Sequence, residues 1–180
     1  MTDYVGKPVP RYDGIGHVTA RTTYVDDIQK PGMLYMKVLT SPVHKGRIRR
    51  LDLSAAEKMP GVAGVISAKD VPGLNAYGLV PDQPVFAPEN IRFKGERIAA
   101  VAAVDEDTAM EALEKIKLDI EEQEPVFDPR EAMKPGAPLV RPEGNVFQFD
   151  SGPARKIRLG DVERGFEEAD RIVEGKYTNG

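Results

Sequence analysis

The residues best able to do chemistry in this sequence are two histidines, because cysteine is absent. His17 stands in a polar, turn-rich segment, and His44 follows Ser41–Pro42. Neither has an obvious carboxylate or thiol companion at metal-ligand spacing. We therefore expect both histidines to be structural or exposed rather than metal ligands or catalytic bases. The lack of cysteine also excludes disulfides, thiolate metal sites, Cys-ligated Fe–S clusters and cysteine nucleophiles on this chain.

A short acidic run offers a second candidate for chemistry. Its carboxylates are Asp119, Glu121, Glu122 and Glu124. Such a group could bind a metal ion, but alternation along a strand would direct the first two to one side and the last two to the other. That separation favours a solvated edge strand, where charges also deter aggregation.

Glycine-rich and serine-centred motifs predict no further site. Asp13-Gly14-Ile15-Gly16 resembles the start of a phosphate loop, but Val18-Thr19-Ala20 comes next without a helix signal. No dinucleotide or triphosphate fingerprint follows a predicted strand. The candidate serine nucleophiles lack a G-x-S-x-G context; they are Ser41, Ser54, Ser67 and Ser151.

Composition limits the class of protein. The chain has 180 residues, 41% of them hydrophobic and 30% charged, with a net charge of −4, so a packed core is expected. Mixed charges give no footprint for nucleic acid or a membrane surface. The first residues resemble no secretory signal, and the longest apolar run, Ile98 to Val104, is too short to span a bilayer. We expect a cytoplasmic protein.

Hydrophobic periodicity predicts a mixed α+β fold without internal repeats. Strands are expected over Met33–Thr40, Gly46–Leu53, Val62–Ser67, Ile91–Phe93, Arg97–Val104, Lys117–Glu121 and Arg171–Tyr177. Helices are expected over Ala55–Met59, after the N-cap residue Asp105, and over Asp161–Asp170. Ser54 and Glu57 fit a capping box for the first helix, and Lys94–Gly95 fits a hairpin turn.

Proline and glycine mark the connections. Residues 68–90 are rich in both, and a loop of that length in a small domain is usually functional or part of an interface. Several prolines come after residue 125, where we place a domain boundary. The expected organisation is one domain over residues 1–125 and a Pro-rich arm over 126–180.

Taken in order, the segments resemble the opening of the large subunits of molybdenum hydroxylases. The matching blocks are Val5 to Arg11, Tyr24 to Asp27, Pro31 to Tyr35, Asp52 to Ala56, Ile91 to Glu96, Ile98 to Ala103, Pro135 to Pro138, Gly160 to Glu163 and Val173 to Tyr177. The block from Ile91 to Ala103 resembles the family pattern V-R-Y-x-G-E-P-V-A-A-V. Departures include His17 for lysine, Ala20 for glycine and Arg97 for proline.

The resemblance to this xanthine dehydrogenase/aldehyde oxidase family implies an α/β-hammerhead domain over residues 1–125. Residues 126–180 would then be an arm and the first elements of a molybdopterin-binding domain. The complete enzymes use molybdopterin-bound molybdenum to hydroxylate a heterocycle or aldehyde with oxygen from water. Fe–S clusters and usually FAD, on partner subunits or domains, carry the electrons away.

None of the family's functional residues falls on this sequence. Its cofactor-contacting glycine-rich loop, substrate-orienting residues and glutamate base lie beyond residue 180. No catalytic, cofactor-binding or metal-binding residue is therefore assigned here, and the chain is expected to be inactive alone. The loop at 68–90 and the turn Arg92 to Glu96 are candidates for contacts with partner subunits; a solvated loop and an ordinary hairpin turn explain them equally well.

Residues 104–134 look closest to the 4-hydroxybenzoyl-CoA reductase branch, while xanthine, nicotinate, carbon monoxide and aldehyde branches stay open. Two hypotheses are compatible with the sequence. The chain is either the scaffold and docking part of a molybdenum hydroxylase, or a free-standing, non-catalytic assembly module that kept the hammerhead. The sequence stops inside the strand predicted at 171–177, which favours the first.

Overall fold

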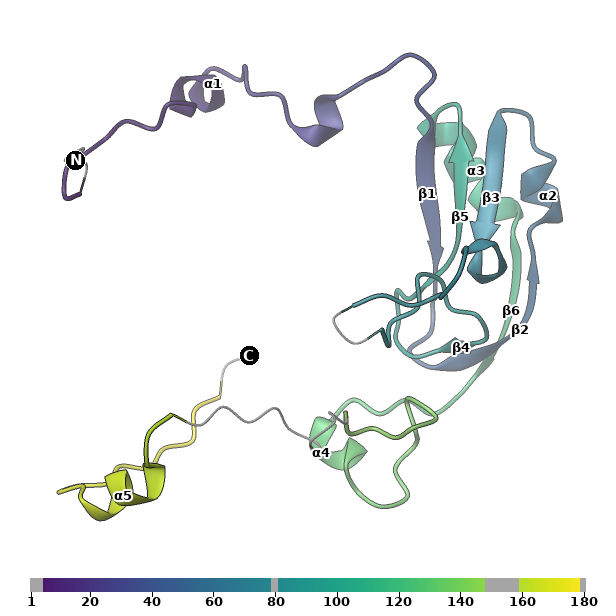
Figure 1. The fold of residues 1–180 in the computed structure, drawn as a ribbon. Coiled ribbons are helices and arrows are strands. Elements are labelled where there is room, and N and C mark those ends of the chain that lie inside the picture. Colours follow the sequence, from purple (N-terminus) through teal and green to yellow (C-terminus); the bar gives the residue numbers. More distant parts are fainter. Residues whose placement is uncertain (1–4, 79–80, 148–158, 179–180) are drawn as a thin grey trace. The chain divides into compact units, whose positions relative to one another are not determined.

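The apolar run after Arg97 forms the central strand of the larger of two sheets. In the computed structural model, β5 (Arg97–Ala103) lies between β1 (Tyr35–Thr40) and β3 (Val62–Ser67), antiparallel to both (Figure 1). The side chains of β5 are almost all buried, as expected for a continuous apolar strand covered on both faces. The structure describes residues 5–78, 81–147 and 159–178.

A second antiparallel sheet has the order β4–β2–β6. Its central strand is β2 (Gly46–Asp52), its long edge strand is β6 (Lys117–Glu122), and β4 (Asn90–Ile91) is short. Gly46 is buried at the start of β2, where it pairs with Ile91 of β4 and with Glu122 of β6. The chain crosses between sheets from β1 to β2 and from β4 to β5, so the two sheets form one domain.

Two helices complete the core of this domain. α3 (Glu106–Lys115) packs against β1, β5 and the short helix α2 (Ser54–Glu57). The buried cluster consists of Leu53, Ala56, Ala99, Val101, Ala112 and Ile116. Alanines predominate on the facing sides of helix and sheet, which lets the two backbones approach closely. The carboxylate of Asp105 accepts a hydrogen bond from the Thr108 N–H at 2.7 Å and begins α3, as predicted.

The remaining helical turns are short. They are α1 (Gly14–Val18), η1 (Val25–Asp27), η2 (Ala68–Asp70), α4 (Pro129–Ala132) and α5 (Val162–Glu167). The chain divides into two units, Met1–Glu124 and Pro125–Gly180. None of the helices in the described ranges is both long and apolar enough to cross a bilayer.

The α+β fold class is confirmed, and so are most predicted strands. The hairpin expected around Lys94–Gly95 is wrong, however. The chain does turn at Gly95, but β4 pairs with β2 in one sheet while β5 joins the other. Alternating hydrophobicity identifies strands and says nothing about which strand becomes a neighbour, which explains the error.

Two other expectations about local structure are wrong. No strand forms over Arg171–Tyr177, whose residues are exposed and have no strand beside them in the described part of the second unit. A helical turn does form at Gly14–Val18, although its two glycines have a low helix propensity.

The helical turn α1 is closed by the loop directly after it. The Arg21 N–H donates to the Gly16 carbonyl at 2.9 Å across Ala20, whose φ is +54°. This is the arrangement of a Schellman C-cap, in which glycine is the usual residue at the left-handed position. A Cβ at Gly16 would lie 2.9 Å from the Thr22 hydroxyl oxygen, so the Thr22 side chain would have to shift to admit a larger residue there.

Asp52, and not Ser54, organises the start of α2. One carboxylate oxygen of Asp52 accepts from the Ser54 N–H at 3.1 Å and from its hydroxyl at 2.6 Å, and the Arg50 guanidinium donates to the other oxygen. Ser54 is therefore the first helical residue, and the predicted Ser54–Glu57 capping box is wrong. The Asp52 carboxylate takes the capping role because one of its oxygens accepts from both the N–H and the hydroxyl of Ser54.

These contacts predict a specific acid sensitivity. Hydrogen bonds from Ser54 and the charge of Arg50 lower the pKa of Asp52 from 3.8 to about 2. A depressed pKa stabilises the fold above the ordinary value and loses that effect as pH falls toward 2. The thermal midpoint of Asp52→Asn should therefore fall less than that of the wild type between about pH 4 and pH 2. An equal fall in thermal midpoint for the two proteins over this pH range would contradict the prediction.

Candidate interface

A buried ion pair fixes the turn between β4 and β5. The side chain of Glu96 is 4% exposed and that of Arg92 16%. The Glu96 carboxylate accepts from the Arg92 backbone N–H at 2.6 Å and from its guanidinium at 2.9 and 3.1 Å. The same guanidinium donates to the Asp82 carbonyl at 2.9 Å, which attaches the long loop to this turn.

Backbone bonds join this turn to the end of β1. The Ser41 N–H donates to the Glu96 carbonyl at 2.8 Å, and the Gly95 N–H donates to the Ser41 carbonyl at 2.9 Å. The buried Ser41 hydroxyl donates in turn to the Val43 carbonyl at 2.8 Å. Ser41 is therefore a structural residue, and the turn Arg92 to Glu96 belongs to the packed domain rather than to a solvated hairpin.

The loop at 68–90 is held at its base by one amide side chain. The Asn75 carboxamide donates to the Phe86 carbonyl at 2.8 Å and accepts from the N–H groups of Val85 and Phe86 at 3.1 and 3.2 Å. Phe86 and Ala87 are buried beneath it. Three hydrogen bonds from one side chain replace the secondary structure that the prolines prevent.

A second contact holds the loop nearer its tip. The Arg97 guanidinium donates to the Tyr77 hydroxyl and lies 5.2 Å from the centroid of its ring. Tyr77 also pairs with Gln83 as an isolated bridge. Leu74 and Tyr77 nevertheless stay exposed on this fixed loop, at 70% and 41%. An ordered loop with exposed apolar side chains is a candidate contact surface.

Asn75→Ala should loosen this loop while leaving both sheets intact. The substitution removes three hydrogen bonds and leaves the Val85 and Phe86 backbone groups without their partner, which costs about 1–3 kcal/mol. Hydrogen exchange at the Val85 and Phe86 amides should accelerate strongly, whereas amides of β5 should exchange as in the wild type. Asn90→Ala, at an exposed position, serves as the control. Unchanged exchange at residues 85 and 86 would show that the loop is ordered by other contacts.

His17 lies in a polar network that spacing alone did not reveal. Its Nδ1 is 2.8 Å from the Tyr24 hydroxyl, and its Nε2 is 3.3 Å from an Asp13 carboxylate oxygen and 3.0 Å from the Arg11 guanidinium. The guanidinium contact and the hydrogen bond from His17 lower the pKa of Asp13. The i,i+4 relation of Asp13 and His17 would have indicated this contact, had the helical turn been predicted.

The other sequence candidates lie apart. His44 is exposed, and so are the four acids of the run, three of them on edge strand β6. Glu121 pairs with Arg49 on the neighbouring strand β2. In the described ranges, no three His, Asp or Glu side chains gather as a metal site would require. Ser54 and Ser67 serve in local turns, and Ser151 is outside the described residues.

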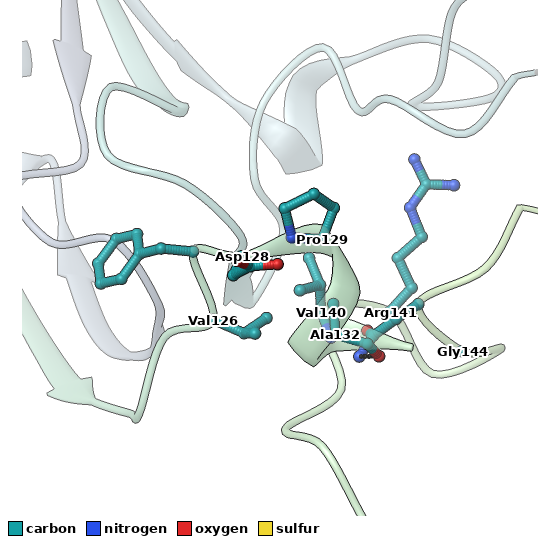
Figure 2. A pocket seen from close by; sticks show the side chains of 9 residues that line it. Val126, Asp128, Pro129, Ala132, Val140, Arg141 and Gly144 are labelled. Atoms are coloured by element: carbon teal, nitrogen blue, oxygen red, sulfur yellow. Dashed lines mark hydrogen bonds between the residues drawn. The ribbon is translucent and has the colours of Figure 1, made fainter. Parts of the chain in front are cut away.

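A hollow of about 290 Å³ lies in the second unit (Figure 2). It is lined by Val126, Phe127, Asp128, Pro129, Ala132, Val140, Arg141, Gly144 and Asn145. The Asp128 carboxylate already accepts from the N–H groups that begin α4. The Asn145 amide bonds to three backbone groups of its own unit. The Asp128 and Asn145 side chains therefore hold the local fold and are not available to bind an anionic cofactor such as molybdopterin.

Comparison with known proteins identifies the family. Residues 19–124 match the family described as "Aldehyde oxidase and xanthine dehydrogenase, a/b hammerhead domain". The chain is 42% identical to a probable xanthine dehydrogenase subunit of Bacillus subtilis, over 93% of this chain and 22% of that protein. It is 33% identical to xanthine dehydrogenase/oxidase of Gallus gallus, over 100% of this chain and 12% of that protein.

Solved structures agree with this assignment. The aldehyde oxidoreductase of Desulfovibrio gigas aligns with a TM-score of 0.71 at 30% identity, covering 80% of this chain and 18% of that one. A Cu,Mo-containing CO dehydrogenase aligns with a TM-score of 0.71 at 35% identity, covering 77% and 18%. The chain thus spans 12% to 40% of the length of the first curated relatives that it matches. It belongs to the aldehyde oxidase and xanthine dehydrogenase family, and residues 19–124 are its a/b hammerhead domain.

Proposed function

We propose that this chain is the scaffold and docking part of a molybdenum hydroxylase and carries no active site of its own. The observation that carries the proposal is the share of each relative that aligns. Nearly all of this chain aligns, but it matches only 12–40% of the length of three proteins named for dehydrogenase or oxidase activity. The bulk of those polypeptides therefore lies outside the matched segment, and we place the catalytic residues there.

The same proposal extends to cofactors and partners. The complete enzyme would hold molybdopterin-bound molybdenum in a further domain, for which residues 126–180 provide the first elements, with Fe–S clusters and FAD on partner subunits or domains. When bound, molybdenum would supply the hydroxylation chemistry. The polar groups around the hollow in the second unit are engaged with their own backbone, which supports a site outside this chain. A cytoplasmic location is part of the proposal.

The substrate branch is also a proposal. Similarity over residues 104–134 favours the 4-hydroxybenzoyl-CoA reductase branch. The relatives in the comparison cover xanthine, nicotinate, aldehyde and carbon monoxide enzymes. An assay of the assembled enzyme with 4-hydroxybenzoyl-CoA, xanthine, nicotinate, an aldehyde and carbon monoxide would decide between the branches.

The main test compares the chain alone with the catalytic polypeptide that continues it or is encoded beside it. We expect the chain alone to contain no stoichiometric molybdenum in elemental analysis and to show no dehydrogenase activity. We expect it to form a stable complex with that polypeptide, and the complex to have both. Molybdenum on the isolated chain would contradict the proposal. Absence of any complex would favour the free-standing assembly module instead.

A further inference from the structure

The segment from Arg11 to Ile28, here named the N-terminal clip, has a defined local structure without burying any apolar side chain. Neither α1 nor η1 contains a buried residue. Six large side chains of the clip are 45% to 98% exposed: Tyr12, Ile15, Val18, Tyr24, Val25 and Ile28. Apolar burial normally drives such packing, and helical turns this short are unstable by themselves, so other contacts must hold the clip.

Those contacts are polar and lie within the clip. His17 bridges Asp13 and Tyr24, and Asp13 also pairs with Arg11. The Tyr24 N–H donates to the Asp27 carboxylate at 2.9 Å. The Gly16 carbonyl accepts from Arg21 and Thr22 at 2.9 and 3.2 Å. Several polar groups of the clip thus bond to one another, while its large apolar side chains are exposed to solvent.

A backbone that internal hydrogen bonds hold in one conformation is preorganised for binding to a partner surface. Hydrogen bonds inside the clip fix the backbone beforehand, so association orders fewer groups and costs less conformational entropy. Clustered exposed apolar side chains mark interaction sites on soluble domains. The charged side chains of the clip are of both signs, and Arg11 pairs with Asp13 inside it; the full set is Arg11, Asp13, Arg21, Asp26 and Asp27. The six exposed apolar side chains therefore require an apolar surface opposite them.

We propose that the N-terminal clip docks onto an apolar surface of the catalytic polypeptide outside residues 1–180. This inference rests on the proposed function and names the surface through which it acts. The occupant is indicated by the relatives. Three of them align with 93–100% of this chain, and the match of 100% includes the clip, while the aligned part is 12–40% of their length. The clip thus occurs with a much longer polypeptide, which can supply the surface.

The competing surface is on the two outer strands of the larger sheet, β1 and β3, whose central strand β5 is buried. Met36 and Ile66 are 60% and 44% exposed there. Their β5 partners Ala102 and Ala100 are half-buried and buried. The test therefore needs probes on both surfaces.

Because the chain has no cysteine, a single introduced thiol labels one chosen position. We would prepare Ile15→Cys and Val25→Cys on the clip, Met36→Cys and Ile66→Cys on the sheet face, and Met110→Cys on α3 as the control. Each is treated with a maleimide in the 180-residue chain alone and in its complex with the catalytic polypeptide. Mass spectrometry reads the label on peptides of this chain only, and the Met110→Cys rate should be equal in both samples.

We expect labelling of Ile15→Cys and Val25→Cys to slow at least tenfold in the complex. A complex that forms while both clip thiols react at the rate of the free chain overturns the docking inference and leaves the proposed function standing. Protection of the sheet-face thiols alone would assign docking to that face instead. Concentration-dependent protection in the chain alone would show that a second copy covers the clip, and would overturn the inference. Failure to form any complex overturns the proposed function itself.

Discussion

Glu96→Ala should destabilise the hammerhead domain by about 3–5 kcal/mol, the cost of breaking a buried ion pair by removing one partner. The change leaves the Arg92 guanidinium and backbone N–H without the carboxylate that accepts from both. It also releases the Asp82 carbonyl contact indirectly, because the guanidinium is no longer held. Urea unfolding followed by circular dichroism would measure the free-energy difference.

The matched control is Glu89→Ala. Glu89 also pairs with an arginine, Arg47, but both side chains are about half exposed. Exposed pairs contribute about 0–1 kcal/mol, so this variant should unfold almost as the wild type does. A second comparison replaces both buried partners, Arg92→Met with Glu96→Leu. It should recover part of the loss, because the apolar side chains need no partner, while the backbone N–H of residue 92 still lacks its acceptor. Equal effects of Glu96→Ala and Glu89→Ala would show that burial does not decide the outcome.

Gly46→Ala should weaken the smaller sheet, by about 1–3 kcal/mol if neighbouring atoms shift to admit the methyl group. A Cβ at residue 46 would lie 2.7 Å from the Ile120 Cγ2 and 3.0 Å from the Glu121 carbonyl oxygen. The second of these atoms is backbone of β6, so relief requires the strands to separate. Amides near the Gly46 end of β6 should then exchange faster, which hydrogen exchange can measure together with the unfolding free energy.

Gly64→Ala is the control, and it should change the free energy of unfolding in the opposite direction. Gly64 is also in a strand, its φ is not in the left-handed region, and nothing lies within 4 Å of the added Cβ. Removing glycine from such a position restricts the unfolded chain and should stabilise by about 0.4–1 kcal/mol. If both alanine variants destabilised equally, strand propensity rather than the close approach at Gly46 would explain the effect.

The elements of the fold could be predicted wherever one local signal dominates. The uninterrupted apolar residues after Arg97 indicated a strand covered on both faces, and β5 is that strand. Asp105 and Asp161 were placed at helix starts, and both accept the expected backbone hydrogen bonds. Caps and apolar runs act through neighbours close in sequence, so their effect is visible in the sequence itself.

Strand pairing and side-chain burial depend on residues far apart in sequence. These features were predicted wrongly or were not predicted. Nothing local indicates that Ile91 joins β2 rather than β5. The Arg92–Glu96 pair was not predicted as a buried contact, although an arginine four residues before a glutamate across a glycine turn is a usable signal. Asn75 gave no signal, because its three partners become neighbours only when the loop closes.

The order of strands in the larger sheet also has a consequence for folding during synthesis on the ribosome. Tyr35 of β1 is paired with Ala103, and Val62 of β3 with the same residue, so neither strand can pair before β5 has been made. The smaller sheet can form only later, because Asp52 of β2 pairs with Lys117 of β6. Pairings between distant residues fold slowly and leave apolar strands uncovered meanwhile. We therefore expect the nascent chain to bind ribosome-associated chaperones until β6 has emerged from the ribosome.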